Sequence, residues 1–290
     1  MLSPSTLEQL KLSRFLTVKG QPSVGYGERR SRKRGGGLEF VDHRPYREGD
    51  DVRYLDALIR ARLGENYIRQ FTVEQRLPIY ILLDGTASMQ YGNPDKFRFS
   101  QELVKALAFI GLSGGDQVQI GNYSRSRLAW SPTVHGLSRT RQLFDWIDSR
   151  EPGGQGSFTE ALQMSKRHIR RASLIILISD WWTEDPTLEI DALTARSSEI
   201  LSFHVCAPEE LDLGRLEGGI LEVLDIENGE EVKLTVDAGT SERYKDALAA
   251  WEAYLGDTFS KCEARYFPLS SSTDIAYLCT QKLRAEGVIT

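Results

Sequence analysis

Two uninterrupted apolar runs constrain the fold of this chain more than any other feature. They span residues 79–83 (Ile-Tyr-Ile-Leu-Leu) and 174–178 (Leu-Ile-Ile-Leu-Ile), and neither contains a charged side chain. Strands with one solvated face alternate apolar and polar residues, whereas strands covered on both faces need no alternation. Both runs therefore predict buried strands of a mainly parallel sheet that has helices on both sides.

The chain from residue 77 onward supports this prediction because strand-like and helix-like segments alternate. Helical periodicity is found at 97–112, 137–147, 159–169, 188–193, 241–259 and 273–283, and further strands are expected at 117–124, 127–130, 200–206 and 264–267. Asn228-Gly229, between two alternating runs, predicts a hairpin. The pattern predicts an α/β, doubly wound fold. We expect residues 1–74 to form an N-terminal helical and extended segment packed on the main domain, which spans 75–290.

Polar side chains follow both apolar runs. Asp84-Gly-Thr86-Ala-Ser88 comes directly after the first, Asp180 follows the second, and Thr159 stands behind the glycine-rich stretch 153–156. In open α/β sheets, ligands bind outside the carboxyl ends of the strands. Hard oxygen donors suit a magnesium-like ion. The alternative interpretation is that Asp84 and Ser88 only cap the next helix.

Two further groups of residues are candidates for contacts with a partner. Trp181 and Trp182 would anchor a partner if their loop is exposed, but the alternative is that at least one of them folds back into the core. The segment 25–37 reads as an exposed, mobile loop that docks an anionic surface, or else as a solvated charge run. Its basic residues are Arg29, Arg30, Arg32, Lys33 and Arg34.

Charge and cysteine content indicate the compartment and limit the partners. The net charge of −5 argues against bulk nucleic-acid binding. No apolar run reaches the 18 or so residues of a membrane helix, and the N-terminus lacks the pattern of a signal peptide. Cys206, Cys262 and Cys279 are odd in number and widely spaced, which favours free thiols, and the four histidines show no Cys/His metal spacing. We expect a soluble cytoplasmic protein.

The polar residues, in their order along the chain, resemble the metal-ion-dependent adhesion site of the von Willebrand factor A domain. That site reads Asp-x-Ser-x-Ser, then a Thr, then an Asp after a later apolar strand. Here Asp84 and Ser88 match the first part, with Thr86 in place of Ser, and Thr159 and Asp180 match the rest. The resemblance implies that the hydroxyls reach a Mg²⁺ (or Mn²⁺) ion, and that the two aspartates act mostly through water or hydrogen bonds. It also implies that the ion accepts a carboxylate from a protein partner.

A closer resemblance covers nearly the whole chain. Motifs that precede the A-like domain look like those of the bacterial domain-of-unknown-function family 58, although its usual Trp after the Leu/Ile-Asp pair is Ala57 here. The motifs are Glu39-Phe40, Arg44-Pro-Tyr46, Glu48-Gly-Asp-Asp-Val-Arg53, Leu55-Asp56, Ala61-Arg62 and Gln70-Phe71. Members are often encoded beside MoxR-type AAA+ ATPases. The resemblance therefore implies a cytoplasmic, non-enzymatic adaptor that works with such an ATPase in protein assembly or maturation.

Two other functions remain open from the residues themselves. An apolar strand that ends in Asp84-Gly-Thr86 is similar to the nucleophile loop of haloacid-dehalogenase-type phosphotransfer enzymes, which would make Asp84 a magnesium-dependent nucleophile. However, Thr86 stands where such enzymes carry an acid, and no phosphate-binding Gly-x-x-x-x-Gly-Lys-Ser/Thr motif is present. Nucleic-acid binding through the basic segment is the third hypothesis, and it predicts a steep dependence on salt.

Overall fold

The computed structural model describes residues 2–17, 30–35, 39–74, 76–182, 185–196, 198–212, 220–224, 231–235 and 238–290. The chain divides into two compact units, Met1–Gly20 with Leu77–Thr290 and Gln21–Arg76. The predicted division at residue 74 differs from this at the N-terminus. Helix α1 (Pro4–Leu10) packs on α3 (Lys96–Ser113), and Phe15 forms an isolated bridge with Ile289, so the first residues belong to the larger unit. Packing of the smaller unit on the larger stays a prediction.

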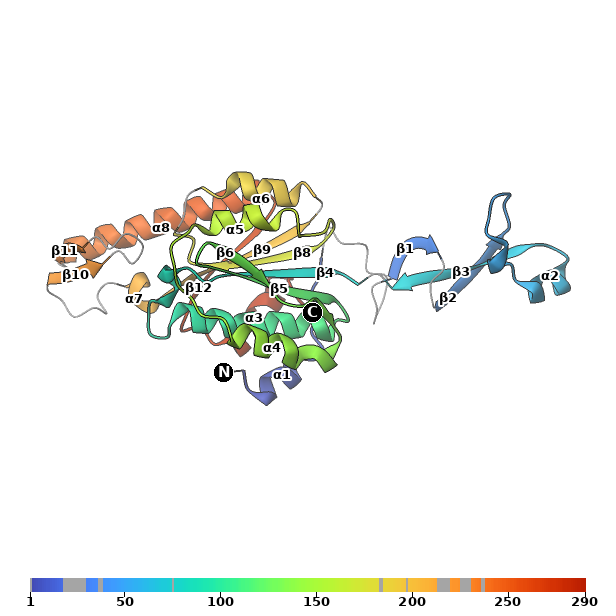
Figure 1. Cartoon of the computed structure of the whole chain (residues 1–290), viewed down its shortest axis with the longest axis horizontal. Helices are drawn as coiled ribbons and strands as arrows, with labels where there is room; N and C mark the ends of the chain where they lie inside the picture. Colours follow the sequence, from blue (N-terminus) through green and yellow to red (C-terminus); the bar gives the residue numbers. More distant parts are fainter. Residues whose placement is uncertain are drawn as a thin grey trace. The chain divides into compact units, whose positions relative to one another are not determined.

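Within the described residues, the larger unit is built on a seven-stranded sheet (Figure 1). The strand order is β12-β9-β8-β4-β5-β6, with β7 also beside β5. The strands are β4 (Pro78–Asp84), β5 (Gln117–Ser124), β6 (Arg127–Trp130), β7 (Val134–His135), β8 (Leu174–Ser179), β9 (Glu199–Cys206) and β12 (Arg265–Ser270). Neighbours from β12 to β5 are parallel, whereas β6 and β7 run antiparallel to β5. The predicted α/β, doubly wound fold with an antiparallel edge is confirmed.

Helices cover both faces of this sheet (Figure 1). One face carries α1, α3 and α4 (Thr140–Asp148), and the other carries α5 (Phe158–Ser165), α6 (Thr187–Thr194) and α8 (Ala238–Lys261). Successive side chains of a strand point to opposite faces. Accordingly Ile81 of β4 packs in the first layer, and its neighbour Leu82 packs in the second. Both layers are apolar, which explains why the run 79–83 has no alternation.

Shorter elements complete the larger unit. The turns and helices are η2 (Ala87–Gln90), η3 (Leu137–Arg139), α7 (Pro208–Leu211), α9 (Ile275–Tyr277), the π-helical η5 (Leu278–Lys282) and α10 (Leu283–Ala285). Strands β10 (Ile220–Leu224) and β11 (Glu231–Thr235) pair antiparallel, so the predicted hairpin is confirmed, while Asn228-Gly229 lies outside the described residues. None of the helices in the described part of the chain combines the length and apolarity needed to cross a bilayer.

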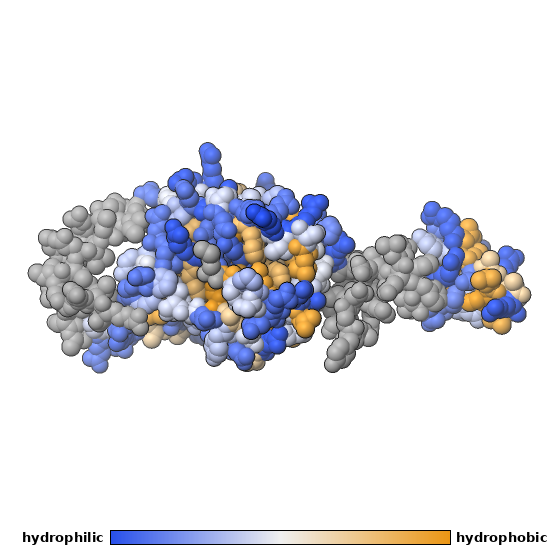
Figure 2. Space-filling view, turned by 90° about the horizontal axis from the view of Figure 1, so that it is seen from below, coloured by the Kyte–Doolittle hydropathy of each residue, from blue (hydrophilic) through white to orange (hydrophobic). Residues whose placement is uncertain are grey.

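The smaller unit contains a three-stranded antiparallel sheet of order β1-β3-β2 within the described residues. Its elements are β1 (Arg30–Gly35), β2 (Glu39–Pro45), η1 (Val52–Tyr54), α2 (Ala57–Leu63) and β3 (Tyr67–Glu74). The prediction of a mobile loop is wrong for Arg30–Gly35, because this segment pairs with β3. Arg29 lies outside the described residues. Figure 2 shows apolar residues at the surface of this unit. Its exposed apolar side chains include Val52, Leu58 and Leu63.

The connections of the sheet separate at β4 and β8. The chain leaves β4 through α3 to reach β5 on one side, and it leaves β8 through α6 to reach β9 on the other side. Because α3 and α6 cover opposite faces, the loops after β4 and β8 diverge. This is the topological switch point at which doubly wound sheets bind their ligands. Asp84 ends β4 at this point, and Asp180 follows β8.

Candidate functional site

Asp84 is buried where β4 and β8 end side by side. The residue is only 2% exposed. Its Oδ1 accepts a hydrogen bond of 2.9 Å from the Thr86 backbone N–H, and its Oδ2 accepts one of 2.6 Å from the Ser179 hydroxyl. Both donors are neutral. The structure therefore brings Asp84 into contact with the loop after its own strand and with the end of the neighbouring strand.

The hydroxyls of Thr86 and Ser88 face each other beside this carboxylate. The turn η2 brings Thr86 Oγ1 and Ser88 Oγ to 3.0 Å. Two neighbouring ligands of an octahedral Mg²⁺, each at about 2.1 Å, lie about 3 Å apart, so this spacing suits two positions of one ion. A glycine is required at position 85, between Asp84 and Thr86, because a Cβ there would lie 2.9 Å from the Tyr123 carbonyl oxygen.

Electrostatics at Asp84 favour the binding of a cation. Burial, with a further contribution from the charge of Asp180, raises the pKa of Asp84 to about 7. Neutral donors only partly offset this, so an ionised Asp84 is costly without a cation nearby. A divalent ion would supply that charge. The buried carboxylate and the two hydroxyls therefore fit a hard divalent cation.

Asp180 differs because it already contacts a cation. The ammonium of Lys96, at the start of α3, lies 2.9 Å from Asp180 Oδ2 and 2.7 Å from Glu210 Oε1, and the Lys96 side chain is 1% exposed. Burial alone would lower the pKa of Lys96, but the charges of Asp180 and Glu210 raise it above its ordinary value. The other oxygen of Asp180 accepts a 3.4 Å bond from the Trp182 N–H. Asp180 thus lies at the predicted edge of the sheet, but its carboxylate is already paired with the Lys96 ammonium.

Sequence reasoning missed Lys96 and Glu210. Lys96 continues the apolar stripe of the predicted helix, three residues before Phe99 and seven before Leu103. A lysine on a buried helix face requires a carboxylate partner. The place of Lys96 on the apolar face could therefore have predicted a buried ion pair, although the sequence does not say which acid would form it.

Thr159 lies in the first turn of α5, and the loop before it contacts the Asp84 loop. The Gly153 N–H donates to the Gly85 carbonyl at 2.8 Å, and the Ala87 N–H donates to the Gly154 carbonyl at 3.2 Å. The Thr159 N–H donates to Ser157 Oγ at 3.2 Å, and the two hydroxyls also pair. The backbone of this loop is therefore next to the candidate site, whereas the described hydrogen bonds join Thr159 to Ser157.

The two tryptophans have different positions. Trp181 is 0% exposed and packs edge-on against Phe158 and Phe259, with ring centroids 5.4 and 4.9 Å apart. The prediction that Trp181 contacts a partner is wrong because its ring fills the core, as the alternative interpretation expected. Trp182 is 44% exposed and lies parallel to Trp251, with centroids 6.3 Å apart. Of this pair, only Trp182 has an exposed side chain, and its contact with a partner stays a prediction.

The basic segment belongs to the smaller unit. Arg30, Arg32, Lys33 and Arg34 are in β1, and their side chains lie outside the described part of the structure, as does Arg29. Their predicted contact with an anionic partner therefore stays a prediction.

A second cluster of ligand-type side chains involves His204, Cys206 and Glu252, whose ligand atoms lie within 4.8 Å of one another. His204 and Cys206 are two apart on β9 and share a face, a spacing that the expectation of no Cys/His metal pattern overlooked. Burial lowers the pKa of His204 to about 4 and raises that of Cys206 to about 12. The His204 ring contacts Cys206 Sγ at 3.2 Å and the Tyr266 hydroxyl at 2.5 Å. Such a donor set suits a softer ion, such as zinc, better than magnesium.

Comparisons with known proteins agree with the motifs. A family model described as "Protein of unknown function DUF58" matches residues 42–254. An uncharacterized protein of Mycobacterium bovis is 24% identical over 265 residues, which cover 89% of this chain and 83% of that protein.

Two solved structures are also similar to the chain. The conserved hypothetical protein BatB from Bacteroides thetaiotaomicron is 14% identical, with a TM-score of 0.45, and the match covers 72% of this chain and 98% of that one. A von Willebrand factor type A protein from Catenulispora acidiphila is 12% identical, with a TM-score of 0.41, over 76% of this chain and 43% of that one.

Proposed function

The chain belongs to the family described as Protein of unknown function DUF58, and on that basis we propose that it is a non-enzymatic adaptor that binds a protein partner through a divalent ion. The observation that carries the proposal is Asp84, a buried carboxylate that accepts its hydrogen bonds from two neutral donors among the described residues. The paired hydroxyls of Thr86 and Ser88 beside it supply further hard oxygens.

In this proposal, Asp84, Thr86 and Ser88 hold the ion, which is Mg²⁺ or Mn²⁺. Thr159 and Asp180 complete its surroundings, and the ion pair with Lys96 holds the Asp180 side chain in place. When bound, the ion supplies an electrophilic centre at which a partner's carboxylate oxygen can be accepted. Few carboxylates among the ligands leave more positive charge on the ion for that interaction.

The protein partner is itself part of the proposal. Trp182, exposed and supported by Trp251, lies two residues after Asp180 and supplies an aromatic contact of the kind that anchors interfaces. A MoxR-type AAA+ ATPase is the candidate partner that the family resemblance implies, with a role in protein assembly or maturation. We also propose that Arg29 and the basic residues of β1 contact an anionic surface of the same partner.

The arrangement around Asp84 favours this proposal over phosphotransfer. A nucleophilic aspartate has to present a free oxygen to the phosphorus atom. Here one oxygen of Asp84 accepts the Thr86 N–H and the other accepts the Ser179 hydroxyl, and the residue is 2% exposed. Both features instead suit a carboxylate that stabilises a bound ion by its charge and through hydrogen bonds, while the hydroxyls of Thr86 and Ser88 reach the ion.

Calorimetric titration of MgCl₂ and MnCl₂ into the metal-stripped full chain tests the proposal. We expect saturable binding of one ion to the unaltered chain. Asp84→Asn should lower the affinity by about tenfold or more, because it removes the negative charge of the carboxylate that stabilises the ion. Ser88→Ala should also weaken binding. Asp145→Asn, on the exposed side of α4, is the matched control and should bind as the unaltered chain does.

Binding that Asp84→Asn leaves unchanged would contradict the proposed site. A second experiment addresses the partner, with a MoxR-type ATPase from the same organism mixed with the chain in Mg²⁺ or in EDTA. Co-elution that requires Mg²⁺ and is lost in Asp84→Asn would support the adaptor function. Co-elution that is equal in EDTA would contradict metal dependence.

A further inference from the structure

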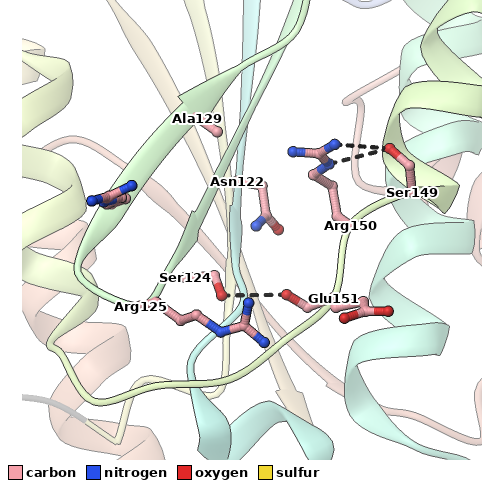
Figure 3. Close-up of a pocket in the computed structure, with 8 residues that line it drawn as sticks. Asn122, Ser124, Arg125, Ala129, Ser149, Arg150 and Glu151 are labelled. Carbon is pink, nitrogen blue, oxygen red and sulfur yellow. Dashed lines mark hydrogen bonds between the residues drawn. The ribbon is translucent and has the colours of Figure 1, made fainter.

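A pocket of about 500 Å³ lies between the β5–β6 hairpin and the segment that follows α4 (Figure 3). It is lined by Asn122, Ser124, Arg125, Arg127, Ala129, Ser149, Arg150 and Glu151. None of these residues belongs to the metal site described above. The pocket is nevertheless close to it along the backbone, since β5 pairs with β4 and Asn122 stands opposite Leu83 in that pairing.

The lining carries an excess of positive charge. Three guanidiniums, from Arg125, Arg127 and Arg150, are set against the single carboxylate of Glu151. None of the three arginines forms an ion pair with a carboxylate of the described residues. Arg150 is held by the Ser149 hydroxyl at 2.9 Å and lies 4.7 Å from the Trp146 ring. In a chain with a net charge of −5, such an unpaired cluster favours an anionic ligand.

Asn122 adds an unsatisfied polar group to the same pocket. The residue is 4% exposed, and its Oδ1 has no hydrogen-bond partner in the described part of the chain. Figure 3 shows its amide directed between the hairpin and the Arg150 segment. Buried polar groups are normally hydrogen-bonded, so this amide is a candidate contact for a bound group with its own N–H. A simple phosphate anion would satisfy the arginines but offers no such donor.

One backbone segment connects this pocket to the Asp84 loop. The Gly153 carbonyl accepts the Arg125 N–H at 2.9 Å and the Ser124 hydroxyl at 3.1 Å, while the Gly153 N–H donates to the Gly85 carbonyl at 2.8 Å. A Cβ on Gly85 would lie 3.1 Å from Asn122 Oδ1, so the amide and the loop are in contact. Gly153 therefore links the lining of the pocket directly to the loop at which the ion is proposed to bind.

We propose that this arginine pocket binds acidic side chains of the protein partner, beside the carboxylate that the same partner offers to the ion. A peptide with acidic residues supplies carboxylates for the guanidiniums and backbone N–H groups for Asn122. The guanidinium fork matches a carboxylate with two parallel hydrogen bonds. This inference rests on the proposed function, because it assigns the sequence character of that partner near its metal-binding residue.

Fluorescence anisotropy with fluorescein-labelled hexaglutamate tests the pocket in the full chain, in Mg²⁺ and in EDTA. We expect saturable binding that weakens by about tenfold in the Arg125→Gln/Arg127→Gln variant, because two charge-assisted contacts are removed. Arg171→Gln is the matched control. Its exposed side chain precedes β8, at the amino end of the strands, and its affinity should stay within about twofold. Labelled hexaglutamine should not bind.

The outcomes separate this inference from the proposed function. Peptide binding that weakens in the double arginine variant, in Mg²⁺ or in EDTA, supports the pocket even if Asp84→Asn has no effect. Binding that Asp84→Asn removes and the arginine variant leaves unchanged overturns the pocket and leaves the metal site standing. Absence of binding to the unaltered chain, or equal weakening in Arg171→Gln, also overturns it.

Discussion

Two buried carboxylates lie at the ends of neighbouring strands of this protein, and they have different partners. Asp84, the last residue of β4, and Asp180, directly after β8, are both 2% exposed. Asp180 contacts the buried ammonium of Lys96, whereas Asp84 receives hydrogen bonds from a backbone N–H and a hydroxyl. Within the part of the chain that the structure describes, a protein cation contacts Asp180 but none contacts Asp84, so a diffusible ion is expected to stabilise Asp84 more than Asp180. The contrast predicts that Asp84 responds to a bound ion more strongly than Asp180 does.

The largest effect should come from removing the cation that Asp180 contacts. Lys96→Met keeps the length of the side chain but leaves the buried Asp180 and the partly buried Glu210 without their ammonium. Breaking a buried ion pair in this way costs about 3–5 kcal/mol of the free energy of unfolding. Urea denaturation followed by circular dichroism measures the loss.

Lys11→Met is the matched control for this substitution. Lys11 pairs with Glu8 on the surface, and both side chains are at least half exposed. Exposed pairs contribute about 1 kcal/mol or less, so the control should remain close to the unaltered chain. If the two lysine variants were equally stable, Asp180 would not depend on a protein cation and the comparison would fail.

The next effect concerns the protonation of Asp84 in the metal-stripped chain. Its pKa is raised from 3.8 to about 7 in the folded state, so between these values the folded protein holds a proton that the unfolded chain has released. Stability from this proton is complete below the lower pKa and is lost as the pH rises through the upper one. Within that window, the free energy of unfolding should fall by about 1.4 kcal/mol for each pH unit from this group.

Urea denaturation at several pH values in EDTA measures this slope, and Asp84→Asn is the control because it cannot titrate. The variant should show a flatter profile than the unaltered chain between about pH 5 and 7. Saturating Mg²⁺ should also flatten the profile, since the ion favours the ionised carboxylate. Identical slopes for the two chains in EDTA would contradict a raised pKa at Asp84.

Much of this fold can be predicted from local sequence pattern. The apolar runs 79–83 and 174–178 identify the central strands because side chains on both of their faces are buried. The limits of prediction lie in pairing between distant segments. The basic stretch was expected to be a loop because of its charge, yet Arg30–Gly35 is paired with β3, some 40 residues later. Pairing of that kind is decided by the partner strand, which charge composition does not reveal.

The candidate site shows the same limit. Asp84, Thr86 and Ser88 are neighbours in sequence, so their spacing alone predicts that they cluster. Lys96 and Glu210 are 114 residues apart, and only the fold brings their charges together. Trp181 and Trp182 are adjacent, but one is in the core and the other at the surface, which depends on the packing of Phe259 from α8.

The smallest effect should distinguish the hydroxyl of Thr86 from its methyl group. Thr86→Ser keeps the oxygen that lies 3.0 Å from Ser88 Oγ and removes one buried methyl, at a cost of about 1 kcal/mol in stability. Its affinity for Mg²⁺ should stay within about threefold of the unaltered chain, because the ligand is retained. Thr86→Val keeps the shape and removes the oxygen, so it should lose about tenfold or more. Calorimetric titration of both variants makes the comparison. An equal loss of Mg²⁺ affinity in the two variants would show that Thr86 acts through its packing and not through its oxygen. The proposed difference between Asp84, which gains from an ion, and Asp180, which pairs with Lys96, would then lose its support.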